Sequence, residues 1–181
     1  MTPPAASDAP GLPHPDLVAA IPRLRRYARV LTGESSRADD LVQDTLARGW
    51  EKRRMWRSGS DLRAWLFTIM HNVWINQLAL ARRDAANVSI DADPGNPAWQ
   101  LSVRGNQLDR VELLELLQQM GRLSADQREV LLLAAVEELR YEEIATILQI
   151  PIGTVMSRLS RARSSLRQLI AEPASTLRVV K

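Results

Sequence analysis

Apolar residues recur along most of this chain at intervals of three and four positions, the spacing that places them on one face of an α-helix. The first such run consists of Leu24, Tyr27, Ala28 and Leu31. Gly33 then predicts the end of that helix, and Pro22 fits either its first turn or a kink. No segment alternates at the period of two that is typical of strands. The pattern therefore predicts an all-α fold.

The same periodicity predicts further helices in both halves of the chain. One is expected from about Arg37 to Arg54, with Leu41, Thr45 and Leu46 on one side, and another from just after Ser60 to about Arg83. In the second half, the apolar face consists of Val111, Leu114, Leu117 and Met120. Gly121 would end that helix, and residues 124–127 form a capping-box pattern that opens the next.

Two segments without such periodicity divide the chain. Residues 84–108 are rich in Asp, Asn, Pro and Gly, which is typical of a linker. Residues 1–15 contain five Pro and are expected to be disordered, and residues 171–181 are expected to form a tail. We therefore expect two small helical domains, at 16–83 and 109–170, joined by a flexible linker.

A helix-turn-helix is expected within the second domain. Residues 141–148 predict a short helix, and Pro151 predicts a turn after it, because proline disfavours helix both at its own position and at the preceding residue. A second helix is expected from about Ile152. Its inward positions are Val155, Leu159, Ala162 and Leu166, and the residues expected to face them are Ile144, Ala145 and Leu148. This arrangement is typical of a DNA-binding domain.

Charge supports that interpretation of the second helix. The chain has 22 Arg and two Lys, and residues 153–168 contain four Arg and no acid. Arginine forms bidentate contacts with phosphate, and Thr154 lies in a first turn whose backbone N–H groups are free to bind phosphate. The alternative is an ordinary amphipathic helix with a solvated arginine face. The predicted turn and the inward spacing favour DNA binding.

Composition argues against several other classes of function. The chain has no Cys, its two His are far apart at positions 14 and 71, and it has neither a Gly-rich phosphate loop nor a spaced carboxylate pair. We therefore expect no enzyme activity, no metal site and no cofactor. The longest uncharged run, residues 64–81, includes five polar side chains, and the N-terminus does not resemble a signal peptide. A soluble cytoplasmic protein is expected.

Three motifs carry a resemblance to a known family. Residues 141–145 (YEEIA), 152–155 (IGTV) and 157–163 (SRLSRAR) resemble the C-terminal promoter-reading domain of an extracytoplasmic-function sigma factor of the bacterial sigma-70 family. Residues 39–46 (DDLVQDTL) resemble the family's core-polymerase-binding helix. Residues 65–72 (WLFTIMHN) resemble the helix that opens the −10 promoter element. The order of the motifs and the linker between them also match.

The resemblance implies a function and a set of partners. Residues 16–83 would be sigma region 2, which binds core RNA polymerase and the −10 element, and residues 109–170 would be region 4, which binds the −35 element. The chain would melt the −10 DNA and initiate transcription of a stress or signal regulon. Partners would be the β′ clamp helices and the β subunit of polymerase, promoter DNA and an anti-sigma factor, often membrane-anchored. No small-molecule substrate is implied, and the acidic linker residues Asp91 and Asp93 would enter the polymerase channel.

The motifs assign site residues by position. Core polymerase would contact Asp39, Asp40, Leu41, Gln43, Asp44 and Arg48. The −10 DNA would contact Lys52, Arg53, Arg57, Thr68, His71, Asn72, Asn76, Arg82 and Arg83. The −35 DNA would contact Thr154, Ser157, Arg158, Ser160, Arg161 and Arg163. Asn is a weak helix former, so Asn residues four apart indicate a face chosen for hydrogen bonding, as flipped bases require.

Some alternatives stay open at this stage. The acids of residues 39–44 would also suit a solvated helix, near whose N-terminus negative charge is favourable. Trp74 could belong to the core or stack on a base. Gln149 stands where the family often has Gly, and carries strain if the turn needs a positive φ; Arg140 stands where an N-cap Ser or Asp is expected. A helix-turn-helix regulator acting on duplex DNA is the alternative function, but it leaves the first half unexplained.

Overall fold

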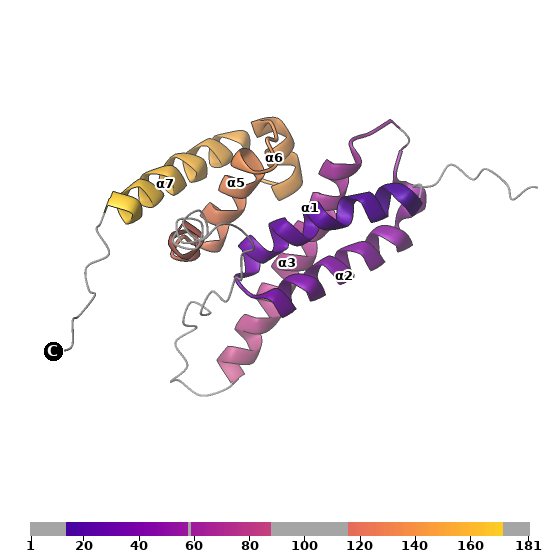
Figure 1. The fold of residues 1–181 in the computed structure, drawn as a ribbon, viewed down its shortest axis with the longest axis horizontal. Coiled ribbons are helices and arrows are strands. Elements are labelled where there is room, and N and C mark those ends of the chain that lie inside the picture. The colour runs from indigo at the N-terminus through magenta and orange to yellow at the C-terminus, as the bar shows by residue number, and fades with distance from the viewer. Residues whose placement is uncertain (1–13, 58, 88–115, 172–181) are drawn as a thin grey trace, which may run out of the picture.

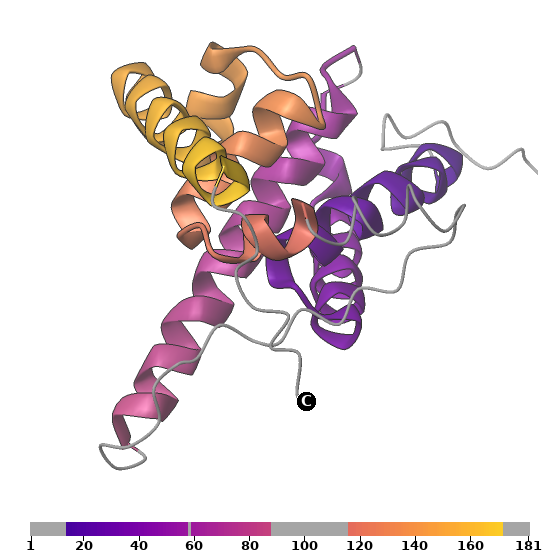
Figure 2. The same ribbon diagram turned by 60° about the vertical axis from the view of Figure 1, so that its left-hand side comes forward.

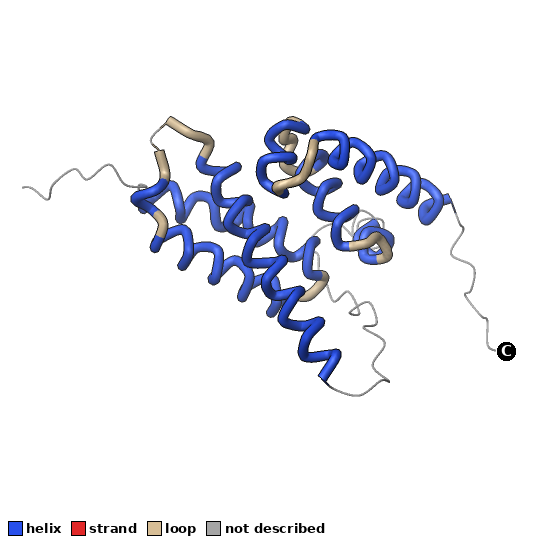
Figure 3. The backbone as a smooth tube through the Cα atoms, turned by 180° about the vertical axis from the view of Figure 1, so that it is seen from behind, coloured by secondary structure: helices blue, strands red, loops and turns tan. Residues whose placement is uncertain are grey.

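The structure is a computed structural model that describes residues 14–57, 59–87 and 116–171. Within these ranges the chain is helical, with short turns and no strand, which confirms the all-α prediction (Figure 3). The Pro-rich start, the linker predicted at 84–108 beyond residue 87, its acidic residues Asp91 and Asp93, and the tail from residue 172 all lie outside them. None of the described helices combines the length and apolarity needed to cross a bilayer.

Three long helices and one short 3-10 helix form the N-terminal unit. These are α1 (His14–Thr32), α2 (Ser35–Glu51), η1 (Arg53–Met55) and α3 (Leu62–Asn87) (Figure 1). The helix α1 begins slightly earlier than the expected domain start and continues through Pro22, so Pro22 is not a first-turn residue. The helix expected from 37 to 54 begins two residues earlier and ends at residue 51, because the chain tightens into η1.

The second half forms the C-terminal unit. It consists of a turn of helix at residues 116–121, α5 (Ala125–Ala135), α6 (Tyr141–Leu148) and α7 (Ile152–Ala171). Ser124 caps α5 as predicted, since its hydroxyl accepts a hydrogen bond from the backbone N–H of Gln127 at 3.4 Å. The helix-turn-helix is confirmed as well. Its buried residues include Val155, Leu159 and Ala162 on α7 and Ile144 and Leu148 on α6.

The turn between α6 and α7 has the backbone conformation that was expected to carry strain. Gln149 has φ 54° and ψ 41°, in the left-handed region, where a side chain crowds the following carbonyl. This conformation lets the N–H of Ile150 reach the carbonyl of Ala145 at 3.1 Å and close the end of α6. Pro151 then accepts from the N–H of Thr154 at 2.8 Å and starts α7.

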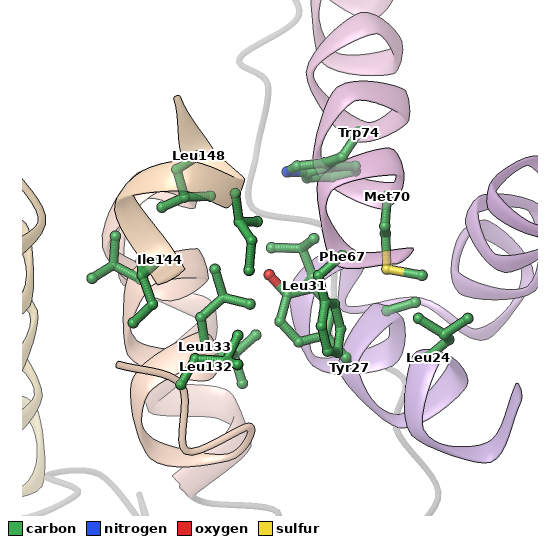
Figure 4. Packing of buried hydrophobic residues seen from close by; sticks show 14 of the residues in the cluster. Leu24, Tyr27, Leu31, Phe67, Met70, Trp74, Leu132, Leu133, Ile144 and Leu148 are labelled. Atoms are coloured by element: carbon green, nitrogen blue, oxygen red, sulfur yellow. The ribbon is translucent and has the colours of Figure 1, made fainter. Parts of the chain in front are cut away.

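The two units pack together through a shared apolar core. Figures 1 and 2 show α5 and α6 beside α1 and α3, with the last turns of α3 projecting away from the body. Tyr27 and Phe67 lie at the centre, with ring centroids 4.8 Å apart, and Figure 4 shows Leu132 and Leu133 on the side of the C-terminal unit that is nearer to them. Trp74 is 8% exposed, so of its two expected places, the core and a base-stacking surface, it occupies the core.

Arg128 connects the units through backbone carbonyls. Its Nε donates to Met120, its Nη2 to Gly121 and Leu123, and its Nη1 to Leu31 at the end of α1, over distances of 2.7–3.0 Å. The residue is 8% exposed, and burial lowers the pKa of the Arg128 guanidinium to about 10. It is therefore charged at neutral pH, and these carbonyls replace water around the buried cation.

We predict that Arg128→Leu lowers the free energy of unfolding by about 3–5 kcal/mol, because it leaves several buried carbonyls without a donor. Urea denaturation of the full chain measures this. Arg122→Leu is the matched control, since Arg122 is exposed and should change stability by about 0.5 kcal/mol or less. Equal losses in the two variants would contradict the role assigned to Arg128.

We predict that Gln149→Gly raises the free energy of unfolding by about 0.5–1 kcal/mol. Glycine removes a left-handed strain of about 1–2 kcal/mol but loses more backbone entropy on folding. The change in thermal midpoint measures the effect. Gln149→Ala keeps a Cβ and should not stabilise the protein; if both variants behave alike, the strain does not reside in the backbone.

Candidate nucleic-acid interface

A hollow of about 170 Å³ lies between α2 and α3, next to η1. Its lining residues are Arg48, Lys52, Met55, Trp65, Thr68, Ile69 and Asn72. Apolar walls therefore lie beside two cations and one exposed amide. This combination suits an unstacked base, which needs a flat apolar surface, a hydrogen-bonding group and a nearby cation for its phosphate.

Local hydrogen bonds hold the polar groups of this hollow in place. Thr68 donates its hydroxyl hydrogen to the carbonyl of Ala64 at 2.9 Å, and the Asn72 amide donates to the carbonyl of Thr68 at 2.9 Å. At the rim, the Arg53 guanidinium lies 4.5 Å from the centre of the Trp50 ring and donates to the Trp50 carbonyl at 2.9 Å. The cationic turn that follows α2 is thereby given a fixed shape.

Most other residues predicted for the −10 contact are also accessible. Asn76 and Arg83 are exposed further along α3, and Lys52 and Arg57 are exposed after α2. The side chain of Arg82 lies outside the described residues.

His71 lies elsewhere. Its Nδ1 is 2.8 Å from Glu129 Oε1 on α5, and its side chain is 13% exposed. The structure thus turns His71 toward the C-terminal unit and away from the hollow.

Sequence reasoning missed part of the hollow. Met55, Trp65 and Ile69 supply its apolar walls, and Arg48, expected at the polymerase contact, lines it too. Met55 is 73% exposed although its neighbours in the sequence are cationic and aromatic. An apolar residue within such a polar turn was the signal that could have found it, because an exposed apolar side chain there suggests a contact.

The acidic face of α2 is solvent-accessible. Asp39, Asp40, Gln43 and Asp44 are exposed; Asp39 pairs with Arg25 at 2.8 Å, and Asp44 accepts a hydrogen bond from Gln77 at 3.1 Å. The expected contact of Leu41 with core polymerase is corrected, because Leu41 is fully buried and packs in the core. It holds α2 in place and cannot touch a partner directly.

The outer face of α7 presents a polar and cationic surface. Ser157, Ser160, Arg161 and Arg163 are exposed, and Thr154 is half-buried. Arg161 donates from Nε to the carbonyl of Ser157 at 3.2 Å, which aligns its guanidinium along the helix.

Arg158 differs from the other arginines of α7. Its Nη2 lies 2.7 Å from Asp126 Oδ2 on α5, and its side chain is only 26% exposed. Arg158, expected among the −35 DNA contacts, therefore lies on the flank of α7 and ties it to α5.

The first turn of α6 compensates for the unusual Arg140. Glu143 accepts a hydrogen bond from the backbone N–H of Arg140 at 2.8 Å and another from Nη2 of Arg140 at 3.3 Å. The backbone bond is the main reason that the pKa of Glu143 lies below its ordinary value. Half of a capping box is thus formed without a side-chain acceptor at the N-cap.

Known proteins resemble both halves of the chain. Residues 17–71 match the family model described as the Sigma2 domain of PhyR, and residues 113–166 match Sigma-70, region 4. A sigma factor named EcfG from Rhodopseudomonas palustris (strain TIE-1) is 39% identical over 86% of this chain and 83% of its own length. The sigma factor SigL of Mycobacterium tuberculosis is 36% identical over 82% of this chain and 83% of its own.

Solved structures agree with these relatives. The sigma factor RpoE of Bartonella quintana, in complex with the anti-sigma factor NepR, has a TM-score of 0.71 and 35% identity, covering 86% of this chain and 94% of that one. CnrH, in complex with the cytosolic domain of CnrY, has a TM-score of 0.59 and 25% identity, covering 86% and 85%. The chain belongs to the extracytoplasmic-function (ECF) family of RNA polymerase sigma factors.

Proposed function

We propose that this sigma factor binds core RNA polymerase through the exposed face of α2, reads the −35 element with α7 and holds melted −10 DNA at the hollow between α2 and α3. It initiates transcription of a stress or signal regulon in the cytoplasm. It acts as a polymerase subunit and catalyses no reaction itself.

The hollow between α2 and α3 is the observation that carries the proposal. A regulator that acts only on duplex DNA has no use for a base-sized pocket with an amide at its edge. Extruding a base from a duplex costs a few kcal/mol, and stacking together with hydrogen bonds to the base edge recovers that cost. Trp65 and Met55 offer apolar contact, and Asn72 offers the hydrogen bonds.

The face of α7 suits the major groove of duplex DNA. A recognition helix contacts bases with residues near its N-terminus, where Thr154, Ser157 and Arg161 are found. Since Asp126 engages Arg158, we assign base reading to Arg161 rather than Arg158. Arg163, further along, suits a phosphate contact.

The acidic face of α2 suits a cationic protein surface rather than DNA. Asp40 and Asp44 would repel phosphates, so a site on polymerase, the β′ clamp helices, is the partner we assign to them. An anti-sigma factor is a further partner, and its support is that the similar sigma factor RpoE of Bartonella quintana was solved with the anti-sigma factor NepR bound.

Run-off transcription with core polymerase on a library of promoter sequences tests the proposal. A sigma factor should form a stoichiometric complex with core polymerase and start transcription at a defined position. A regulator that acts on duplex DNA alone would bind DNA but would neither join core polymerase nor direct initiation, and that result would overturn the proposal.

We predict that the double variant Asn72→Ala with Asn76→Ala opens promoter DNA at least about 10-fold more slowly, because the lost contacts favour only the unstacked base. Permanganate footprinting of the −10 region measures opening, and filter binding measures the closed complex, which should be unchanged. Gln118→Ala is the matched control, since it removes an exposed amide that lies in none of the proposed contacts. Normal opening by the double variant would remove the Asn face from the site.

We predict that Arg161→Ala flattens the preference among −35 variants by about 1–3 kcal/mol, whereas Arg163→Ala weakens binding to all sequences and lowers the salt dependence. Arg158→Ala should lower stability slightly and leave base preference unchanged, because its partner is Asp126. Holoenzyme binding to promoter variants at two salt concentrations separates these effects. A uniform loss in all three variants would mean that α7 contributes only electrostatics.

A further inference from the structure

The packed arrangement of the two units conflicts with simultaneous promoter contact. Helix α3 packs against α6, and α6 against α7, so two packing distances place α7 within about 20 Å of α3. The −10 and −35 elements lie about 25 base pairs apart, or about 85 Å along the duplex. If the proposed function holds, the units must therefore separate before both elements can be bound. A segment as long as residues 88–115 reaches about 95 Å at full extension, which permits this.

One charged residue is buried entirely by this packing. The Glu137 side chain, in the turn between α5 and α6, is 0% exposed, and its carboxylate faces the side chains of Arg23 and Arg26. Its Oε2 lies 3.1 Å from Arg23 Nε, and its Oε1 lies 3.8 Å from Arg26 Nη2. Arg63 of α3 donates to the Glu137 backbone carbonyl at 3.0 Å. All three cations belong to the N-terminal unit.

The turn presents Glu137 in a fixed direction. The backbone N–H groups of Val136 and Glu137 both donate to the carbonyl of Leu132, at 2.9 and 3.1 Å. Glu138 has φ 53°, so the chain reverses there, leaving Glu138 exposed while Glu137 faces the N-terminal unit. Leu139 is buried beside it and anchors the far side of the turn.

Burial and the neighbouring arginines act on the pKa of the Glu137 carboxyl in opposite directions. Burial raises the pKa of the Glu137 carboxyl above its ordinary value, although Arg23, Arg26 and Arg63 act in the opposite direction. The attraction thus does not fully replace lost hydration. The apolar core holds the units together, and the buried carboxylate is tolerated only while the arginines remain beside it.

Two of those arginines can be bound by an external anion in competition with Glu137. The side chains of Arg23 and Arg26 are 48% and 59% exposed, so an external anion can reach them without any prior movement. The ion pair of His71 with Glu129 and the hydrogen bonds of Arg128 lack this property. His71 and Glu129 are both largely buried, and the Arg128 hydrogen bonds to Met120, Gly121 and Leu123 stay within the C-terminal unit when the units separate.

We propose that the two units stay packed together, in a closed state, only while Arg23 and Arg26 offset the charge of Glu137. The phosphate backbone of DNA would open the chain, that is, separate the two units, by binding these two arginines. A phosphate binds arginine in bidentate geometry, and DNA presents many phosphates in a row. Once they are engaged, only Arg63 is left to offset the charge of the buried Glu137 carboxylate. Separation of the units returns it to water and frees α3 and α7 for the promoter.

The chain has no Cys, so Ala47→Cys on α2 and Ser164→Cys on α7, both exposed, can carry a pair of nitroxide labels in the full-length protein. Pulsed electron–electron double resonance then gives the distance between the two labels, and so between the units. The chain alone should show one narrow distance. A 20-base-pair duplex without promoter elements should replace it with a broad, longer distribution, which potassium chloride of equal ionic strength should not do.

Variants at both sides of the contact make the test specific. Arg23→Gln with Arg26→Gln should open the chain without DNA, lowering the closed-to-open ratio at least about 100-fold, because the buried charge loses its partners. Glu137→Gln should stay closed even with the duplex, because no charge is stranded. Glu138→Gln, the exposed neighbour, should behave as the unaltered chain. Circular dichroism should show equal helicity throughout, so that opening is not mistaken for unfolding.

Three results would overturn the proposal: an unaltered chain that stays closed with the duplex, a Glu137→Gln variant that opens as readily as the unaltered chain, or an arginine double variant that remains closed. Opening by core polymerase but not by DNA would assign the release to protein contact and would also overturn it. These distances are measured without transcription. Failure here therefore leaves the run-off result intact, and failure of run-off transcription leaves the distances intact.

Discussion

The apolar surface around Tyr27 and Phe67 is the constraint on which the arrangement of this molecule depends. Three helices can enclose their own axis but leave one side of α1 and α3 uncovered, and that side contains two aromatic rings. Covering it with Leu132 and Leu133 brings the helix-turn-helix against the first unit. The charges at Arg128, Glu129 and Glu137 are buried as a result, and each has a compensating group across or beside the interface.

The helices were predictable because their apolar residues repeat at intervals that only a helix satisfies. The turn at Gln149 was predictable too, since Pro151 restricts the backbone before it. The end of α2 was not, because η1 continues the helical backbone in a tighter turn. No local feature of the sequence distinguishes the α-helix from the 3-10 helix here. The helical backbone ends only at Trp56, which is extended.

Site residues were harder to predict where a partner lies far away in the chain. His71 and Arg158 look like members of polar faces, but Glu129 and Asp126, 58 and 32 positions away, occupy them. Leu41 was misassigned because a motif was carried over whole, although a buried leucine in it can only support its neighbours. The walls of the hollow were missed since Trp65 and Ile69 read as ordinary core.

The far end of α3 has a mechanical consequence. The helix extends over 26 residues, about 39 Å, and its last turns project beyond the packed body (Figure 2). The chain that leads to the second unit therefore starts at the end of a projecting helix rather than at the surface of the first unit. In the proposed open state, the length and direction of α3 would fix where the connection to the second unit begins. They would therefore limit which spacings between two DNA elements a single molecule can bridge.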